Sequence, residues 1–354
     1  MTSLEPPYGG ADAGDMLVRI GALSAHVTGA LDRMAARPWR PPVTAPGLVA
    51  VGALGGSAIA ADLTAALFAD RLPHPLLVVR DYRWPACVAG DALAVLSSYS
   101  GETEETLSLY REAGERGVAR VAMTSGGTLA AWCGRDGVPL TTYPGGSPPR
   151  AALFPSWVAF SALLHAIGWL EDPTPGWREA AEVLAAGARR LGADVPEPAN
   201  PAKRLARALH GRLVFVYAAS ERIGPVATRV RNQLNENAKL LGHSALAPEL
   251  THNEIVGWER PGPVRSMASV LVLRDREDRP ETTRRLTLTA EYVAAQGAAV
   301  HEWSSSGEGR LARLASLVQF GDYLSFYLAL LNGVDPTPIA SIDAFKRRLA
   351  APGA

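Results

Sequence analysis

Cysteine is scarce in this chain of 354 residues, which contains only Cys87 and Cys133, and their spacing is not that of a metal site. Such sparing use is typical of proteins kept in a reducing compartment. Residues 1–15 lack the basic start and the apolar core of a signal peptide. No apolar run reaches the roughly 20 residues that span a bilayer. These absences predict a cytoplasmic protein that has no membrane partner.

An excess of charge is also missing, because 35 Lys and Arg residues balance 35 Asp and Glu residues. This balance gives no indication of nucleic acid or of a membrane surface as a partner. The hydrophobic content of 47% and the charged content of 20% are ordinary for a soluble protein. At this length we expect two domains or one large domain, with an ample core.

A stretch rich in hydroxyl groups begins where an apolar run ends. Residues 93–96 (Leu-Ala-Val-Leu) have the continuous apolar character of a parallel strand buried on both faces. Ser98, Ser100 and Thr103 follow at the start of a predicted helix, where backbone N–H groups and the helix dipole favour an anion. Gly101 allows the backbone to approach a ligand closely. Serine and threonine also cap helices routinely, but three hydroxyls in this short stretch favour a bound phosphate.

A second turn of small residues follows the first predicted strand, residues 48–51. Gly55, Gly56 and Ser57 lie between this strand and a predicted helix over residues 59–68. In parallel sheets such turns form ligand sites at the carboxyl edge. A Gly-Gly-Ser sequence alone is a weak signal, but it has the same position in its strand–helix unit as the Ser98 loop has in the next. We therefore expect Ser57 and the Ser98 loop to anchor the same phosphate.

Strands and helices alternate along the chain, which predicts a doubly wound parallel sheet. The order strand, loop, helix and strand in residues 93–125 recurs in residues 268–304, and this repetition predicts two similar α/β domains. Charged residues 274–278 stand where the first copy has serines, so we expect one phosphate site per chain. The polar segment 171–200 is predicted to contain the linker. We place an N-terminal segment with a helix at 1–40, the first domain at 41–185, and the second domain, with C-terminal helices over 321–331 and 342–349, at 195–354.

Three residues have the chemistry of a proton-transfer site. Glu236 lies among amide side chains on a helix that is predicted to start near Gly224, and amides can orient a carboxylate. His252 and Arg150 have the chemistry of a titrating group and of a fixed cation. By composition alone, however, Glu236 is an ordinary surface residue, a lone histidine is more often structural, and an arginine before a helix is usually solvated. The residue types by themselves leave the roles open.

Three motifs carry a resemblance to a known family. Residues 98–103 (Ser-Tyr-Ser-Gly-Glu-Thr) resemble the phosphosugar-binding loop of sugar isomerase (SIS) domains. Residues 235–239 (Asn-Glu-Asn-Ala-Lys) and 251–257 (Thr-His-Asn-Glu-Ile-Val-Gly) resemble, in order and separation, motifs of the bifunctional phosphoglucose/phosphomannose isomerases. The resemblance covers nearly the whole chain and implies two SIS-type domains, each a parallel sheet flanked by helices. The family usually has glycine where Ala53 stands.

The resemblance implies an enzyme that interconverts glucose 6-phosphate and/or mannose 6-phosphate with fructose 6-phosphate through a cis-enediol. It implies Glu236 as the base, His252 as the group that opens the sugar ring, and Arg150 as the cation near the sugar. In the family the histidine typically enters the site from the neighbouring subunit, so we expect a homodimer with a shared active site. Neither a metal nor a cofactor is implied. The expected substrate-binding residues are Gly55, Gly56, Ser57, Ser98, Ser100, Thr103 and Lys346, the last by a loose alignment with a family lysine.

Other interpretations stay open. One is a different SIS enzyme, such as an amino-sugar or pentose phosphate isomerase, although the motifs at Glu236 and His252 belong to the hexose type. Another is a phosphosugar-sensing regulator, for which the sequence shows neither a helix-turn-helix segment nor a basic patch. A duplicated relative that binds phosphosugars with little catalysis is weakly allowed by Ala53. The preferred C2 epimer, the oligomeric state and the pathway are not predicted.

Overall fold

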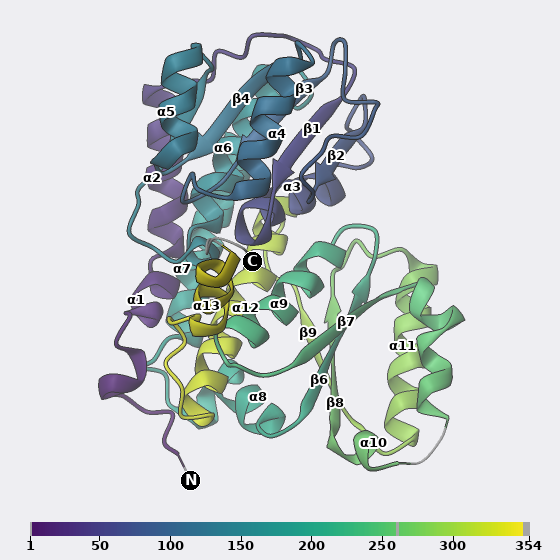
Figure 1. Ribbon diagram of the computed structural model, residues 1–354. Coiled ribbons are helices and arrows are strands. Elements are labelled where there is room, and N and C mark those ends of the chain that lie inside the picture. The colour runs from purple at the N-terminus through teal and green to yellow at the C-terminus, as the bar shows by residue number, and fades with distance from the viewer. Residues whose placement is uncertain (1, 260–261, 350–354) are drawn as a thin grey trace.

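The computed structural model describes residues 2–259 and 262–349 and has two parallel sheets, one in each half of the molecule (Figure 1). The first sheet has the strand order β2-β1-β3-β4-β5, and every neighbouring pair is parallel. Its central strands are short apolar runs with both faces covered by helices, and every residue of β1 and β3 is buried. The strands are β1 (Val49–Ala53), β2 (Leu76–Val79), β3 (Leu93–Ser97), β4 (Ala119–Thr124) and β5 (Leu140–Thr142).

The second sheet repeats this arrangement with the strand order β7-β6-β8-β9, again all parallel. The predicted repetition of the two halves is visible here, because β6, β8 and β9 take the places of β1, β3 and β4. The edge strand β7 was not predicted from the sequence; its residues are mostly half-buried and lack a continuous apolar run. The strands are β6 (Leu213–Ala219), β7 (Gly242–Ala247), β8 (Ala268–Arg274) and β9 (Ala299–Ser304). The α/β class is thus confirmed.

Helices cover both faces of the two sheets. The single helix predicted within residues 1–40 is in fact two helices that meet at Ala22, whose φ of −88° and ψ of 5° depart from helical values. The helices are α1 (Met16–Gly21), α2 (Leu23–Ala36), α3 (Gly55–Leu67), α4 (Glu104–Glu115), α5 (Gly127–Asp136), α6 (Leu153–Ala166), α7 (Thr174–Leu191), α8 (Pro201–Leu209), α9 (Gly224–Glu236), α10 (Pro263–Met267), α11 (Pro280–Ala295), α12 (Arg310–Leu331) and α13 (Ala340–Leu349).

The segment predicted as a linker contains α7, which is a core helix. Trp177, Ala180 and Leu184 are fully buried on one face of α7, which packs against α12 and α2. The polar residues that suggested a linker lie on the opposite face, as in any amphipathic helix at a surface. The domain boundaries at 41–185 and 195–354 stay a prediction, and residues 1, 260–261 and 350–354 lie outside the described part of the chain.

Helix α12 forms the centre of the larger core, which is shared by both halves of the chain. That core combines side chains of α2, α3 and α6 with those of β6, β8 and α12. Within the described residues, α12 is also the one helix that is long and apolar enough to cross a membrane, with a mean hydropathy of 1.4. The protein itself buries 94% of that apolar window, as expected for the core helix of a globular fold.

Candidate active site

The hydroxyl groups of the loop after β3 form hydrogen bonds with one another and with backbone N–H groups of the same loop. The Ser98 and Thr103 hydroxyl oxygens lie 2.8 Å apart, and Ser98 Oγ also accepts a hydrogen bond from the Gly101 N–H at 3.1 Å. Ser100 Oγ accepts from the Glu102 N–H at 3.2 Å. Thr103 occupies the N-cap position of α4, yet its side chain forms no capping hydrogen bond. Capping therefore does not account for all three hydroxyls, which favours the ligand interpretation.

Gly101 is required where this loop meets the next one. Its φ is +73°, and a Cβ at this position would lie 1.9 Å from the carbonyl oxygen of Gly126. Any other residue would force the loops after β3 and β4 apart. The loop after β3 therefore keeps its shape because its backbone packs closely against the loop after β4.

The turn after β1 differs from the prediction, because α3 begins at Gly55 and not at residue 59. Gly55 and Gly56 thus form the first helical turn, where backbone N–H groups have no partner within the helix. Ser57 Oγ accepts a hydrogen bond from the Tyr99 N–H at 3.1 Å, which joins this turn to the loop after β3. Ala53 ends β1 in register with Ser97 and is fully buried, so its methyl group lies in the core.

Arg150 joins the first half of the chain to the second. It lies in a short 3₁₀ turn (Pro149–Ala151) and is only 3% exposed, whereas a surface charge was the ordinary expectation. A Cβ on Gly56 would come within 3.2 Å of the Arg150 backbone nitrogen, so the turn after β1 lies against it. Its Nη1 is 3.5 Å from Glu236 Oε2. Burial lowers the pKa of the Arg150 guanidinium, while the neighbouring Glu236 carboxylate acts in the opposite direction.

Glu236 is the last residue of α9, and its side chain is 29% exposed. The amides on either side of it have other partners, contrary to the expectation that they orient the carboxylate. Asn235 Oδ1 accepts from the Gly242 N–H at 2.9 Å, and Asn237 Oδ1 accepts from Arg150 Nε at 2.7 Å. Arg150 is therefore the charged group that faces the Glu236 carboxylate.

Lys239 is a member of this cluster that the sequence did not single out. Its Nζ donates to the carbonyl oxygens of Glu236, Asp335 and Pro336, at 2.7, 3.0 and 3.2 Å. Burial and the nearby Arg150 lower the pKa of this ammonium group. A lysine just beyond a helix C-terminus commonly binds the last carbonyls, and that rule was the available signal.

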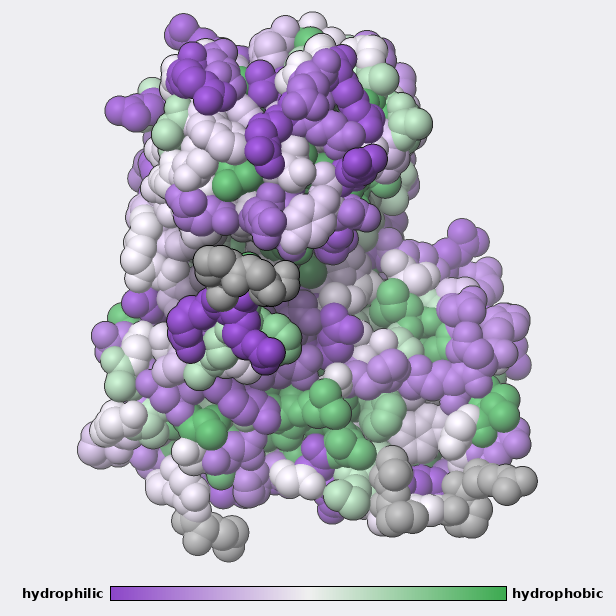
Figure 2. Space-filling model, viewed as in Figure 1, coloured by the Kyte–Doolittle hydropathy of each residue, from purple (hydrophilic) through white to green (hydrophobic). Residues whose placement is uncertain are grey.

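A groove of about 720 Å³ leads to this cluster between the two halves of the chain. It begins beside Gly55 and is lined on the other side by Thr228 and Asn232 of α9. Residues four apart share a helix face, so Glu236 continues the row formed by Thr228 and Asn232. Figure 2 shows the surface hollowed between the two halves. Among the described residues that line the groove, Gly55 is the one predicted site residue, and Glu236 lies one helical turn beyond the part of α9 that forms the opposite wall.

His252 and Lys346 are not brought into contact with this cluster. His252 ends a 3₁₀ helix (Glu249–His252) after β7, and Lys346 lies on α13; both are exposed. Among the described residues, neither side chain forms a hydrogen bond or an ion pair. Within a single chain the cluster therefore consists of Glu236, Arg150 and Lys239, next to the turns after β1 and β3.

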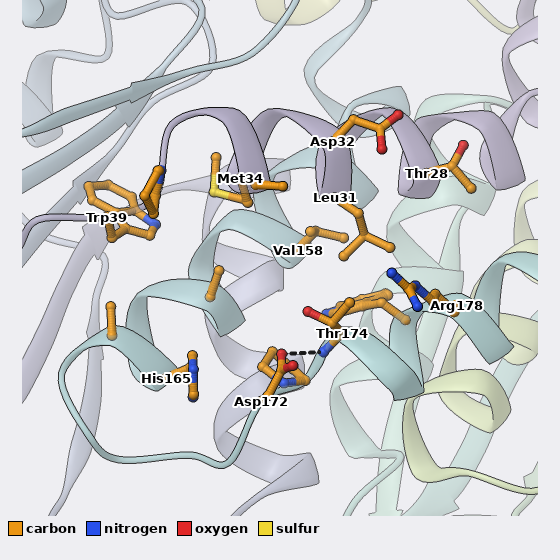
Figure 3. Close-up of a pocket in the computed structure, with 16 residues that line it drawn as sticks. Thr28, Leu31, Asp32, Met34, Trp39, Val158, His165, Asp172, Thr174 and Arg178 are labelled. Carbon is orange, nitrogen blue, oxygen red and sulfur yellow. Dashed lines mark hydrogen bonds between the residues drawn. The ribbon is translucent and has the colours of Figure 1, made fainter.

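A separate cavity of about 360 Å³ lies between α2, α6 and the start of α7 (Figure 3). Apolar side chains such as Leu31, Trp39 and Val158 line it, and the Asp172 carboxylate beside it accepts a hydrogen bond from the Thr174 N–H at 2.9 Å. None of the predicted site residues lines this cavity. It is therefore distinct from the cluster around Glu236 and Arg150.

The loop after β8 has ion pairs where its counterpart after β3 has hydroxyl groups. Asp275 is buried there and accepts hydrogen bonds from Ser305 Oγ at 2.6 Å and from Arg313 Nε at 3.0 Å. Arg310 pairs with Asp70, just beyond α3, at 2.8 Å and so ties the two halves together. The second half thus holds its own carboxylates at the position that corresponds to the phosphate loop. One phosphate site per chain stays our expectation.

We expect the stability of the protein to fall as the pH rises from about 4 to about 6, because of Asp278 in this loop. Burial, followed by the charges of Asp275 and Glu221, raises the pKa of Asp278 to about 6. An unfolded aspartate releases its proton near pH ~3.9, so in this range the folded state binds more protons than the unfolded state. Asp278→Asn should flatten this part of the stability curve, measured by urea unfolding at each pH. Parallel curves for wild type and variant would contradict the assignment.

The two halves, with their parallel sheets and the hydroxyl-rich loop after β3, define the SIS class of fold. A glucose-6-phosphate isomerase like protein from Thermus thermophilus superimposes with a TM-score of 0.59 at 22% identity, covering 92% of this chain and 96% of that chain. The profile of the family described as "Bacterial phospho-glucose isomerase C-terminal SIS domain" matches residues 198–349.

Curated relatives define the particular family. The bifunctional phosphoglucose/phosphomannose isomerase of Caldicellulosiruptor bescii is 38% identical over 302 residues, covering 85% of this chain and 89% of the relative. The protein of the same name from Aquifex aeolicus is 31% identical over 308 residues, covering 86% and 90%. This chain belongs to the bifunctional phosphoglucose/phosphomannose isomerase family.

Proposed function

We propose that this chain is an aldose–ketose isomerase that interconverts glucose 6-phosphate and/or mannose 6-phosphate with fructose 6-phosphate. The observation that carries the proposal is the Glu236 carboxylate 3.5 Å from the buried Arg150, whose backbone lies against Gly56 in the turn after β1. Membership of the family supports the same activity. We further assign the reaction to a cis-enediol intermediate, in which a proton moves between C1 and C2.

Glu236 is the proposed base. A carboxylate can take the proton from one carbon and return it to the other, acting first as general base and then as general acid. The partial exposure of Glu236 at the end of α9 leaves its carboxylate accessible to a substrate. Because the planar enediol has lost the C2 stereocentre, proton return to either face would give glucose or mannose 6-phosphate from one site.

Arg150 is the proposed electrophile. The enediolate carries negative charge that the bound sugar does not, and a fixed cation stabilises such developing charge in a site that excludes water. Arg150 Nη1 faces Glu236, so it lies next to the carbons between which the proton moves. Arg150 would therefore stabilise the charge on the enediolate oxygen atoms, while Glu236 moves the proton between the carbon atoms.

The phosphate is proposed to bind Ser57, Ser98, Ser100 and Thr103, with the N–H groups of Gly55 and Gly56. The hydrogen bond between Tyr99 and Ser57 joins the start of α3 to the loop that leads into α4, and helix N-termini favour anions. Binding energy from the phosphate can orient the reacting carbons against Glu236.

Thr103→Val should raise KM for fructose 6-phosphate by about tenfold and leave kcat within about twofold, because it removes mostly uniform binding. Valine keeps the shape of threonine but lacks the hydroxyl that meets Ser98 Oγ. The measurement is steady-state kinetics with Thr283→Val, an exposed threonine on α11, as the matched control. An unchanged KM in Thr103→Val would remove the phosphate from this loop.

His252 and Lys346 are proposed to complete the site, although neither contacts the cluster around Glu236 within one chain. His252 is exposed at the carboxyl edge of the second sheet, where a neighbouring subunit can receive it, and we assign it to ring opening in a homodimer. Lys346 is assigned to the sugar through α13. The two cysteines and the metabolic substrate support the cytoplasm as the compartment.

The test is a coupled assay with fructose 6-phosphate that reads glucose 6-phosphate and mannose 6-phosphate separately. Formation of either product supports the proposal and shows the preferred epimer. Each proposed step uses a side chain of the protein, so we expect the activity to survive EDTA. Activity that EDTA removes and zinc restores would contradict the mechanism, and activity only with amino-sugar or pentose phosphates would favour a different SIS reaction.

A further inference from the structure

The Arg150 guanidinium is held in place by neutral acceptors. Its Nε donates to Asn237 Oδ1 at 2.7 Å, and its Nη2 donates to the carbonyl oxygens of Pro336 and Thr337 at 2.7 and 2.8 Å. The remaining nitrogen, Nη1, lies 3.5 Å from the Glu236 carboxylate, beyond the range of a good hydrogen bond. Three acceptors therefore fix the orientation of the guanidinium plane and leave Nη1 directed at the base.

Other buried arginines of this protein are neutralised by a carboxylate. Arg229 Nη2 lies 2.8 and 3.0 Å from the two oxygen atoms of Asp322, and Arg313 pairs in the same way with Asp275. Such charge-assisted pairs are the usual solution for a buried arginine. Arg150 has instead an amide at the corresponding distance, so its charge is not cancelled by the group that holds it. A cation kept in this state is stronger toward an anion that forms during the reaction.

The amide of Asn237 is itself oriented from behind. Asn237 is fully buried, and its Nδ2 donates to Ser325 Oγ at 3.0 Å. The Ser325 hydroxyl donates its own proton to the Asp322 carbonyl oxygen at 2.9 Å, so it can only accept from Asn237. The Nδ2 group must then face Ser325, and Oδ1 must face Arg150. This series of hydrogen bonds determines which atom of the Asn237 amide is oxygen and which is nitrogen, an assignment that atom positions alone would leave ambiguous.

We infer that Asn237 is a positioning residue of the isomerase: it holds the Arg150 guanidinium without neutralising it, so that Nη1 is presented to the enediolate. The inference rests on the proposed function. Asparagine meets this need where aspartate would not, because a carboxylate has the same shape but would place a negative charge 2.7 Å from the cation. Asn237, the residue after Glu236, therefore holds the arginine that lies opposite the Glu236 carboxylate.

The test is Asn237→Asp in the full-length protein, assayed with fructose 6-phosphate. We expect kcat to fall by at least about tenfold, because the electrophile is partly cancelled in the transition state. KM should stay within about twofold, because the phosphate binds elsewhere. The matched control is Asn200→Asp, which changes a second fully buried asparagine that caps α8. It should lower the melting temperature and leave kcat unchanged at a temperature where both variants are folded.

Chemical rescue keeps the inference testable if Asn237→Asp does not fold. In Arg150→Ala the three acceptors remain, so added guanidinium should restore part of kcat. The rescue should be lost in Arg150→Ala/Asn237→Ala. Equal rescue in both backgrounds, or a kcat for Asn237→Asp within about twofold of an active wild type, would overturn this inference alone. A wild type without isomerase activity would overturn the proposed function and this inference with it.

Discussion

Glu236→Gln is expected to lower kcat by about 10²–10⁴, the usual contribution of a general acid–base group. Glutamine keeps the shape of the side chain and its place 3.5 Å from Arg150, but it cannot accept the proton from C1 or C2. The affinity for fructose 6-phosphate should change little, because the proposed phosphate site lies at the turns after β1 and β3, away from Glu236. Wild type in D₂O should place deuterium at C2 of the aldose, and Glu236→Gln should not.

The matched control is Glu115→Gln. Glu115 is the last residue of α4, as Glu236 is of α9, and it is exposed and remote from the groove. It should leave both kcat and deuterium exchange at the wild-type level. If Glu236→Gln stays within about threefold of wild type, far below the range of a general base, the mechanism proposed for this protein is wrong.

Arg150→Ala is expected to lower kcat by about 10²–10³, the range found when one group that stabilises a developing oxyanion is removed. Arg150→Lys should also be impaired, because an ammonium group cannot reach Asn237, Pro336 and Thr337 with one planar fork. KM should rise less than kcat falls. The measurement is steady-state kinetics together with direct binding of fructose 6-phosphate.

A structural effect of Arg150→Ala must be separated from the catalytic one. The variant leaves the Asn237 amide oxygen and the Thr337 carbonyl without their donor, whereas the Pro336 carbonyl keeps Lys239 Nζ. Each buried group left without a partner costs ~1–3 kcal/mol. The melting temperature should therefore fall, and kcat is to be compared at a temperature where wild type and variant are both folded. A lower melting temperature with kcat within about tenfold of wild type, below the expected range, would mean that Arg150 only tethers the segment before α13.

Local patterns were sufficient for the fold class and for the position of the hydroxyl-rich loop after β3. The buried strand β3 is a continuous apolar run, and Ser98, Gly101 and Thr103 follow it within one loop. Their relation is set by a few consecutive dihedral angles, so sequence order already contains it. The motif around Glu236 could be recognised for the same reason, since all its residues are adjacent in the chain. These elements carried the family resemblance, which the comparisons confirm.

The sequence was less informative for segments that contain both polar and apolar residues, because their pattern does not show whether they are buried. Residues 171–200 were predicted as a linker because they are polar and rich in proline around one Ala-rich helix. The buried face of that helix, α7, became evident only through α12, more than a hundred residues later. Strand β7 lacks a continuous apolar run, because an edge strand is covered less completely than a central one. Both differences arise from neighbours that are distant in sequence.

The partners of the charged groups were decided by the tertiary structure alone. Arg150 meets Asn237 and Pro336 across 87 and 186 residues of chain, and only the packing of the two halves brings them within 2.7 Å. The sequence could place Asn237 next to Glu236, but it could not show that the amide faces the arginine. Whether two groups form a hydrogen bond depends on differences of a few tenths of an ångström in their separation, and here the two groups belong to elements far apart in the sequence. The sequence therefore determined which residues could do the chemistry, and the docking of the two halves decided which of them meet.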